Sequence, residues 1–236
     1  MKALDPLSLA ARRVTVIAPH PDDESLGCGG LIATLAADGR AVQVVFVTDG
    51  SGSHSNSLTW PRVRLAEQRR CEAATALACL GVTAVPPVFL DLPDTAMPRL
   101  DDPAGEAVVG RLAGVLAKFA PVLVLLPWRR DPHCDHRDAW ALTHAALSRA
   151  GLAPDLLEYA IWLDELGADG DQPRDDEGEG LEFDISATMA VKRKAVEAHI
   201  SQTTGLIDDD PTGFRLSAET IDRLVQPVER YWRPTR

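Results

Sequence analysis

The sequence predicts a single α/β domain whose mostly parallel sheet is covered by helices on both faces. Apolar, strand-like runs alternate with longer amphipathic segments, an order typical of parallel sheets. The run from Ala41 to Thr48 is apolar at almost every position, which indicates a strand buried on both faces. The chain has 236 residues, of which 45% are hydrophobic, and this is enough for one sizeable core. We therefore expect one Rossmann-like domain over residues 1–236.

The first two thirds of the chain show the alternation of strands and helices most clearly. A strand at 14–19 leads through a loop into a helix of about ten residues that ends near Asp38-Gly39, where glycine supplies the C-cap. Proline suits the first turn of the next helix, and Gly81 suits its end. The further elements expected here are a strand at 41–48, a helix at 61–80, a strand at 88–90, a helix at 106–119, a strand at 122–126 and a helix that contains 139–149.

The last third of the chain has a less regular pattern. A fifth strand is expected at 156–163, followed by an acidic, glycine-rich exposed loop at 164–180. The acidic residues of this loop lack the spacing of an EF-hand, so we expect a solvated insertion rather than a calcium site. A helix is expected at 188–200, and the tail at 216–232 is expected to add a strand or a helix.

Composition argues against several classes of function. The formal net charge of -11 disfavours a broad nucleic-acid surface, because phosphates require clustered lysine and arginine. No stretch approaches the roughly 20 apolar residues of a membrane span, and the N-terminus lacks the pattern of a secretory signal. The four cysteines lack CxxC spacing, which favours reduced thiols. We expect a cytoplasmic protein that acts on a small molecule, and the sequence leaves its oligomeric state open.

Chemically active side chains cluster directly after the first strand, in the stretch Ala18-Pro19-His20-Pro21-Asp22-Asp23-Glu24. Ligands of open α/β sheets collect at the carboxyl ends of the strands, so this imidazole and these carboxylates are candidates for a metal site. A helix start with acidic residues favoured by the dipole is the alternative. Gly27, Gly29 and Gly30 also suggest a nucleotide-binding turn. However, Ile32 occupies the place of the last glycine of a GxGxxG pattern, and the acids would repel a pyrophosphate.

A second cluster follows the strand at 122–126 and contains His133, Asp135 and His136. Because parallel strands deliver their C-terminal loops to one edge of a sheet, the two clusters can meet although they lie far apart in the sequence. Two imidazoles, a carboxylate and a water form a plausible set of zinc ligands. The alternatives are helix capping by Asp135 and Asp138 and a buried, satisfied imidazole at His133.

Other polar loops are expected at the same edge of the sheet. The loop at 49–55 follows the second strand and is expected to line the pocket, with an ordinary flexible connection as the alternative. Four side chains on predicted rim loops are candidates for substrate contact, although surface packing explains each of them equally well: Arg64, Arg129, His54 and Trp128.

Both clusters resemble known motifs. HPDDE at His20–Glu24 and HCDH at His133–His136 resemble the paired motifs of the PIG-L or LmbE-like zinc-dependent N-deacetylases. The resemblance covers nearly the whole chain, since further stretches are similar in the same order: TDGSGSH after the second strand, the helix with Arg64 and Glu67, LDLPD at Leu90–Asp94, and Lys194 with His199-Ile200-Ser201-Gln202. It implies a hydrolase that removes the N-acetyl group of an N-acetylglucosamine unit in a glycoside, glycolipid or related small molecule.

The resemblance also implies a role for each motif residue. The implied ligands of Zn²⁺, or of another divalent metal, are His20, Asp23 and His136. Asp22 is implied to be the general base that accepts a proton from water. His133 is implied to stabilise the oxyanion or protonate the leaving amine, with Asp135 orienting it. Two other functions are considered, a nucleotide-binding Rossmann module and a non-catalytic sugar-binding protein, and the second would not require the base Asp22.

Overall fold

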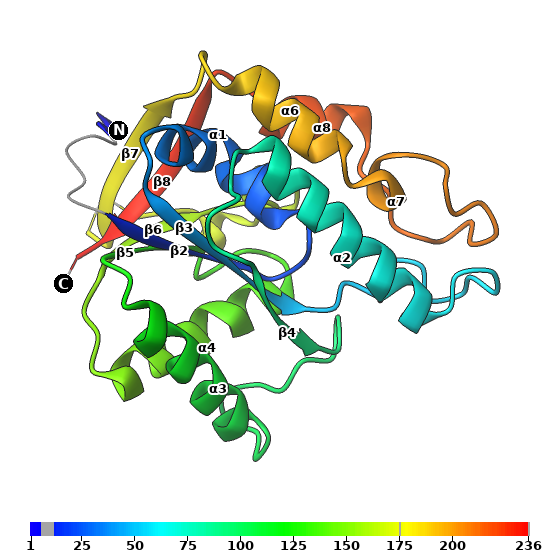
Figure 1. The fold of residues 1–236 in the computed structure, drawn as a ribbon, viewed down its shortest axis with the longest axis horizontal. Helices are drawn as coiled ribbons and strands as arrows, with labels where there is room; N and C mark the ends of the chain where they lie inside the picture. Colours follow the sequence, from blue (N-terminus) through cyan, green and yellow to red (C-terminus); the bar gives the residue numbers. More distant parts are fainter. Residues whose placement is uncertain (6–11, 175, 236) are drawn as a thin grey trace.

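The computed structural model describes residues 1–5, 12–174 and 176–235. Within them the chain forms one α/β domain around an eight-stranded sheet with the order β1-β7-β8-β6-β5-β2-β3-β4 (Figure 1). The central strands β6, β5, β2, β3 and β4 are parallel to one another, whereas β8 runs antiparallel to β6 and β7. The predicted mostly parallel sheet is therefore confirmed. The strands are β1 (Lys2–Ala3), β2 (Arg13–Ala18), β3 (Ala41–Thr48), β4 (Val88–Leu92), β5 (Leu123–Pro127), β6 (Asp155–Tyr159), β7 (Gly178–Asp184) and β8 (Val228–Pro234).

Helices cover both faces of the sheet, as predicted. α3 and α4 pack against each other on one face, and α1, α2 and α6 pack together on the other (Figure 1). The helices are α1 (Asp23–Ala37), α2 (Arg62–Cys79), α3 (Gly105–Phe119), α4 (Cys134–Ala150), α5 (Leu163–Leu166), α6 (Met189–Glu197), α7 (Ile200–Thr203) and α8 (Ala218–Leu224), with a 3-10 turn at Asp169–Asp171.

Alternate side chains of the central strands enter two separate hydrophobic cores. Along β2, Val14 and Val16 belong to the core that contains Leu31 of α1. Ile17 belongs to the opposite core, together with Leu112 of α3. Successive side chains of a strand point to opposite faces, so a strand between two helical layers must be apolar on both. This explains the continuous apolar runs of the sequence.

The first helix is kinked close to the first sequence motif. Cys28 has φ -143° and ψ 20°, which interrupts the helical geometry of α1. The carboxylate of Glu229 on β8 accepts the N–H groups of Gly30 and Leu31 at 2.8 and 2.9 Å. Lys192 of α6 pairs with the same carboxylate at 2.8 Å, and both side chains are buried. The kink thus creates a second helix start whose free N–H groups are satisfied by a paired anion.

Several predicted boundaries differ from the observed ones. β6 ends at Tyr159 rather than at residue 163, because the N–H groups of Ile161 and Trp162 donate to Oδ2 of Asp131, both at 3.1 Å, instead of continuing the ladder. The helix expected at 188–200 ends at Glu197 and is followed by the short α7.

The acidic segment at 164–180 also differs from a simple loop. It contains most of α5 and the 3-10 turn, and its last residues begin β7, which pairs along its length with β8. Residue 175 of this segment lies outside the described residues. The tail supplies both a helix and a strand, α8 and β8. The sequence did not predict β1.

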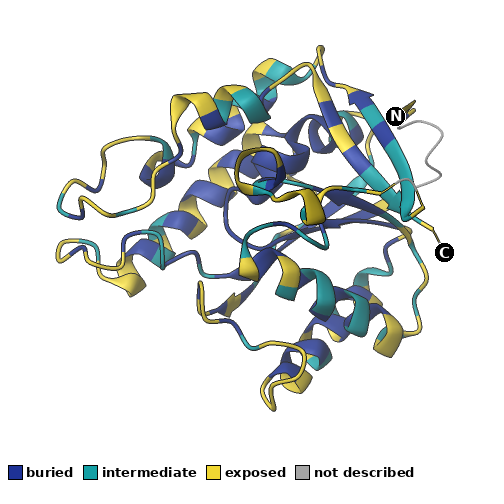
Figure 2. Cartoon of the chain, turned by 180° about the vertical axis from the view of Figure 1, so that it is seen from behind, coloured by how far each residue is buried: buried dark blue, intermediate teal, exposed yellow. Residues whose placement is uncertain are grey.

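The distribution of buried and exposed residues follows these layers. Figure 2 shows the central strands as buried and the outer faces of the helices and the long loops as exposed. Within the described part of the chain, no helix combines the length and the apolar character that a membrane crossing requires.

Candidate active site

The loops that leave the parallel strands meet around a cavity of about 300 Å³. β2 leads to the first motif, β3 to the loop with Gly52 and Ser53, β4 to Asp94, and β5 to the second motif. The cavity is lined by His20, Asp22, Asp23, Asp94 and His133, together with residues of the loop at 49–55 and of the segment after α7. The two sequence motifs therefore converge as predicted, and the glycine-rich loop lines the pocket.

His20 lies at the centre of a group of carboxylates. Its Nδ1 is 3.1 Å from Oδ2 of Asp23, and its Nε2 is 3.1 Å from Oδ2 of Asp135 and 3.2 Å from Oδ1 of Asp94. Burial acts to lower the pKa of His20, but hydrogen bonds to Asp135, Asp23 and Asp94 raise it well above the ordinary value. The cluster therefore has surplus negative charge and favours a cation at this place.

His136 approaches the same carboxylate from α4. Its Nε2 is 3.2 Å from Oδ2 of Asp23, and its Nδ1 is 3.3 Å from Oδ1 of Asp131. The side chain is fully buried, yet these two contacts are not aligned as hydrogen bonds. A buried imidazole without a hydrogen bond is costly in a folded protein.

These side chains fit a divalent metal ion. One oxygen of Asp23 lies between His20 and His136, and one ring nitrogen from each of His20, His133 and His136 lies within 4.8 Å of the other two. In its neutral form the ring of His136 has one nitrogen with a free lone pair, and both of its nitrogens face carboxylates of this group. Imidazole and carboxylate ligands suit zinc and several other divalent metals.

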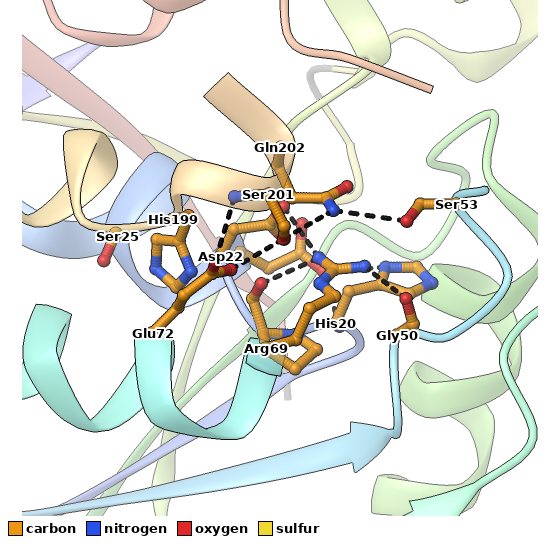
Figure 3. A network of polar contacts seen from close by, with 12 residues as sticks. His20, Asp22, Ser25, Gly50, Ser53, Arg69, Glu72, His199, Ser201 and Gln202 are labelled. Atoms are coloured by element: carbon orange, nitrogen blue, oxygen red, sulfur yellow. Dashed lines mark hydrogen bonds and ion pairs between the residues drawn. The ribbon is translucent and has the colours of Figure 1, made fainter. Parts of the chain in front are cut away.

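Asp22 is held in an unusual conformation beside this cluster. Its φ is 150°, a value that side-chain-bearing residues adopt only when the surroundings enforce it. Its backbone N–H donates to Oε2 of Glu24 at 3.0 Å, and its Oδ2 accepts from Nη2 of Arg69 at 2.9 Å (Figure 3). Burial raises the pKa of Asp22 to about 6, although Arg69 opposes this. A carboxylate with this pKa is mostly ionised at pH 7 and is able to accept a proton.

Arg69 is fixed by the loops around it. Its Nη1 donates to the carbonyl oxygen of Gly50 and its Nη2 to that of Pro21, both at 2.7 Å (Figure 3). Gly50 has φ 65°, and a Cβ at this position would clash with the guanidinium group. Glycine is thus required here both for the turn and for the close approach of Arg69.

A further network of buried hydrogen bonds connects the first motif to α2 and α7. His199, which precedes α7, lies with its Nε2 3.2 Å from Oε1 of Glu24, and both side chains are fully buried. Glu72 of α2 accepts the N–H and the hydroxyl of Ser201 at 2.9 and 2.7 Å (Figure 3). Gln202 donates to Ser53 at 3.2 Å at the edge of the cavity. The late motif at 199–202 therefore joins α2 and the first motif.

The second motif is arranged differently from the expectation. His133, rather than Asp135, caps α4: its Nδ1 accepts the N–H of Asp135 at 3.2 Å. The carboxylate of Asp135 was expected to orient His133, but it lies against His20 and accepts the N–H of Thr95 at 2.8 Å. The cap occupies the ring nitrogen that such a carboxylate would need. Burial, together with the neighbouring His20 and His136, lowers the pKa of His133 to about 4.

Sequence reasoning missed three residues of the site. Asp94 was noted only within the LDLPD stretch and Asp131 was not singled out, although each follows a parallel strand, which was an available signal. Arg69 was not singled out. It lies four residues after Leu65 and four before Ala73, both buried, so its position on the apolar stripe of α2 indicated a buried guanidinium.

The four rim candidates do not line the cavity. Arg64 lies over the ring of Trp60, 3.9 Å from its centroid, and Arg129 pairs with Glu158 at 3.0 Å. Trp128 and His54 are both buried. Packing, the alternative considered from the sequence, accounts for these contacts.

The fold is that of an α/β protein with a mostly parallel sheet. At the carboxyl ends of the parallel strands, histidines and carboxylates form a site of the kind that binds a metal ion. The family model described as PIG-L, GlcNAc-PI de-N-acetylase, matches residues 15–147, more than half of the chain. The chain belongs to this family.

Similar proteins include sugar deacetylases. The 1D-myo-inositol 2-acetamido-2-deoxy-alpha-D-glucopyranoside deacetylase of Mycobacteroides abscessus is 30% identical, with 89% of this chain and 87% of that protein covered. The diacetylchitobiose deacetylase of Thermococcus kodakarensis is 32% identical, with coverages of 81% and 70%. The structure of N,N'-diacetylchitobiose deacetylase from Pyrococcus horikoshii matches with a TM-score of 0.63 at 26% identity, covering 85% of this chain and 74% of that one.

Proteins of another activity share the fold. The structure of GalB, a 4-carboxy-2-hydroxymuconate hydratase, matches with a TM-score of 0.69 at 20% identity, covering 94% of this chain and 95% of that one. At this identity the likeness shows the fold alone, so function must be argued from the site.

Proposed function

We propose that the chain is a Zn²⁺-dependent N-deacetylase that removes the acetyl group from an N-acetylglucosamine-containing glycoside, glycolipid or related small molecule. The observation that carries this proposal is the position of Asp23 Oδ2, 3.1 Å from His20 and 3.2 Å from His136, in a cavity that also exposes Asp22. Deacetylases of acetylated amino sugars among the relatives support the same reaction.

His20, Asp23 and His136 would hold the metal ion, zinc or another divalent cation. When bound, such an ion supplies Lewis acidity, which lowers the pKa of water and polarises an amide carbonyl. Asp94 and Asp135 keep His20 oriented through its second nitrogen, and Asp131 does the same for His136. Carboxylates in these positions fix the ring planes of metal-binding histidines.

Asp22 would serve as the general base. It lines the cavity next to Asp23, and Arg69 and Glu24 hold its side chain and backbone in place. From there it accepts a proton from the attacking water, a role that typically contributes about 10²- to 10⁴-fold in rate. Asp22 and Asp23 therefore have different tasks, although they are adjacent in the sequence.

His133 would stabilise the oxyanion. Its Nδ1 accepts the N–H of Asp135, and its lowered pKa leaves the ring neutral at pH 7. A neutral imidazole that accepts through Nδ1 has its proton on Nε2, from which it donates a hydrogen bond to developing negative charge. This favours oxyanion stabilisation over protonation of the leaving amine.

The two other functions considered have less support. In a nucleotide-binding turn the glycines would face a phosphate, whereas a Cβ at Gly27 would overlap the ring of Tyr159 and one at Gly30 would overlap Ile185. These glycines allow α1 to pack closely. A non-catalytic sugar-binding protein would not need Asp22 to be held at a strained φ beside a metal-type site. A cytoplasmic location stays a prediction from the sequence.

The test is direct. The purified protein, loaded with Zn²⁺, is incubated with N-acetylglucosamine, N,N'-diacetylchitobiose and the inositol glycoside of N-acetylglucosamine, and released acetate is measured. We expect acetate from at least one compound, and loss of this activity after chelation with recovery on addition of Zn²⁺. Activity that persists after verified metal removal, or no acetate from any compound with zinc verified in the protein, would overturn the proposal.

A further inference from the structure

One wall of the cavity is aromatic. Trp162, in the turn before α5, and Phe214, in the segment between α7 and α8, both line the cavity that holds Asp22 and His133. Their ring centroids lie 5.7 Å apart with an interplanar angle of 85°, an edge-to-face pair. Phe214 is 40% exposed, so part of this wall faces solvent. We refer to Trp162 and Phe214 as the aromatic wall.

Backbone hydrogen bonds fix both members of the wall. The N–H of Trp162 donates to Asp131 at 3.1 Å, and the N–H of Phe214 donates to the carbonyl oxygen of Ser53 at 2.7 Å. The segment with Phe214 is also clasped to the loop after β3, because Asp209 accepts from the hydroxyl of Ser57 at 2.6 Å and from two backbone N–H groups. A wall that is already in place costs little ordering entropy when a ligand binds.

The charge of the cavity opposes an anionic ligand group outside the metal site. Among the described residues that line it, the one guanidinium or ammonium group is that of Arg69, whose two Nη atoms are bound by Asp22 and by two carbonyl oxygens. The lining also includes the carboxylates of Asp22 and Asp94. A phosphate in this cavity would meet like charges, with no free guanidinium or ammonium group among the described lining residues to pair with.

From these observations we infer that the aromatic wall selects substrates in which N-acetylglucosamine carries an uncharged, apolar aglycone, aromatic or alkyl. The inference rests on the proposed deacetylase function and names the substrate class within it. The amide would lie at the histidine–carboxylate cluster, and the aglycone would pack on Trp162 and Phe214. Apolar contact with aromatic rings favours such a group over a hydroxylated or phosphorylated one.

The test compares two substrates on one enzyme. Released amine is measured for the phenyl and methyl glycosides of N-acetylglucosamine with the zinc-loaded protein, and the ratio of their kcat/KM values is calculated. We expect a ratio of about 10 in favour of the phenyl glycoside, the order expected from stacking and burial of one ring. Trp162→Ala and Phe214→Ala should each bring the ratio close to one, and Trp162→Phe should recover part of it.

Controls separate this inference from folding and from the proposed function. Because the ratio compares two substrates, a loss of folded protein changes both values equally. Trp60→Ala removes a tryptophan that does not line the cavity. This variant should show the same ratio of kcat/KM values for the phenyl and methyl glycosides as the wild-type protein. If acetate is released but the ratio is near one, or if diacetylchitobiose or N-acetylglucosamine 6-phosphate is preferred, this inference fails while the deacetylase function stands. No turnover of any compound overturns both.

Discussion

The carboxylate of Asp131 joins His136 to the turn that carries Trp162. Its Oδ1 lies 3.3 Å from Nδ1 of His136, and its Oδ2 accepts the N–H groups of Ile161 and Trp162, both at 3.1 Å. Both Asp131 and His136 have no exposed surface. One buried side chain at the end of a parallel strand thus positions a candidate metal ligand and one half of the aromatic wall.

Replacement of Asp131 by alanine should weaken metal binding. We expect the affinity for Zn²⁺ to fall by roughly 10- to 100-fold, the usual effect of removing a carboxylate that orients a ligating histidine. Competition with a chelator of known affinity measures this change. Asp131→Asn keeps an oxygen acceptor for the backbone N–H groups and should fold as the unchanged protein does. Wild-type zinc affinity in Asp131→Ala would contradict the assignment.

Replacement of His136 by alanine should remove most of the bound metal. The ring is buried, and its contacts with Asp23 and Asp131 are not aligned as hydrogen bonds, which fits a ring nitrogen that faces a metal ion. Elemental analysis after dialysis gives the zinc content per chain. His144→Ala is a matched control, because His144 lies on the same helix and packs against Trp140 instead, with the rings tilted by 43°. Equal zinc content in the two variants would exclude His136 from the ligand set.

Asp22→Asn should keep the metal but lose most of the hydrolytic activity. The amide preserves the shape and the oxygen that faces Arg69, but it is unable to accept a proton. We expect kcat to fall by about 10²- to 10⁴-fold with the zinc content unchanged. Saturation kinetics and elemental analysis on the same preparation separate the two effects. Undiminished turnover would rule out Asp22 as the base.

The hydrogen bonds that Asp209 accepts from the loop after β3 should make the free energy of unfolding depend on pH in the acidic range. Hydrogen bonds from Ser57 and Thr59 lower the pKa of Asp209 to about 2 from an ordinary 3.8. A carboxyl group whose pKa is lower in the folded state than in the unfolded state stabilises the fold at any pH above its unfolded-state pKa. This stabilisation is lost as the pH falls through its folded-state pKa. Asp209→Ala should therefore be less stable than the unchanged protein by a constant amount between pH 5 and 7.

Urea denaturation of both proteins over this range and down to pH 3 checks the prediction. The difference should shrink as the pH falls below about 4, since the unchanged protein then loses the same contribution. Asp208→Ala serves as a control at the neighbouring exposed position. A difference that stays constant to pH 3 would show that the carboxylate charge does not contribute.

Local sequence patterns determined most of the sheet and the long helices. Apolar runs such as the one at Ala41–Thr48 are written in consecutive residues, and the observed β3 has the predicted bounds. The convergence of the two motifs was also predictable, because parallel strands that alternate with helices must end at one edge. That rule brings His20 and Asp23 near His133 and His136, and the family resemblance then implied which of them would hold a metal ion, namely His20, Asp23 and His136.

The tertiary structure alone decided the partners of these side chains. Arg69 reaches Asp22 across 47 residues, Asp131 reaches Ile161 across 30, and Asp135 faces His20 rather than His133. The end of β6 and the pairing of β7 with β8 depend on similar contacts. The periodic pattern of neighbouring residues does not predict these contacts, because hydrogen bonds between distant segments form only after the segments have packed together. The sequence therefore predicted which residues gather at the site, and packing determined which atom faces which.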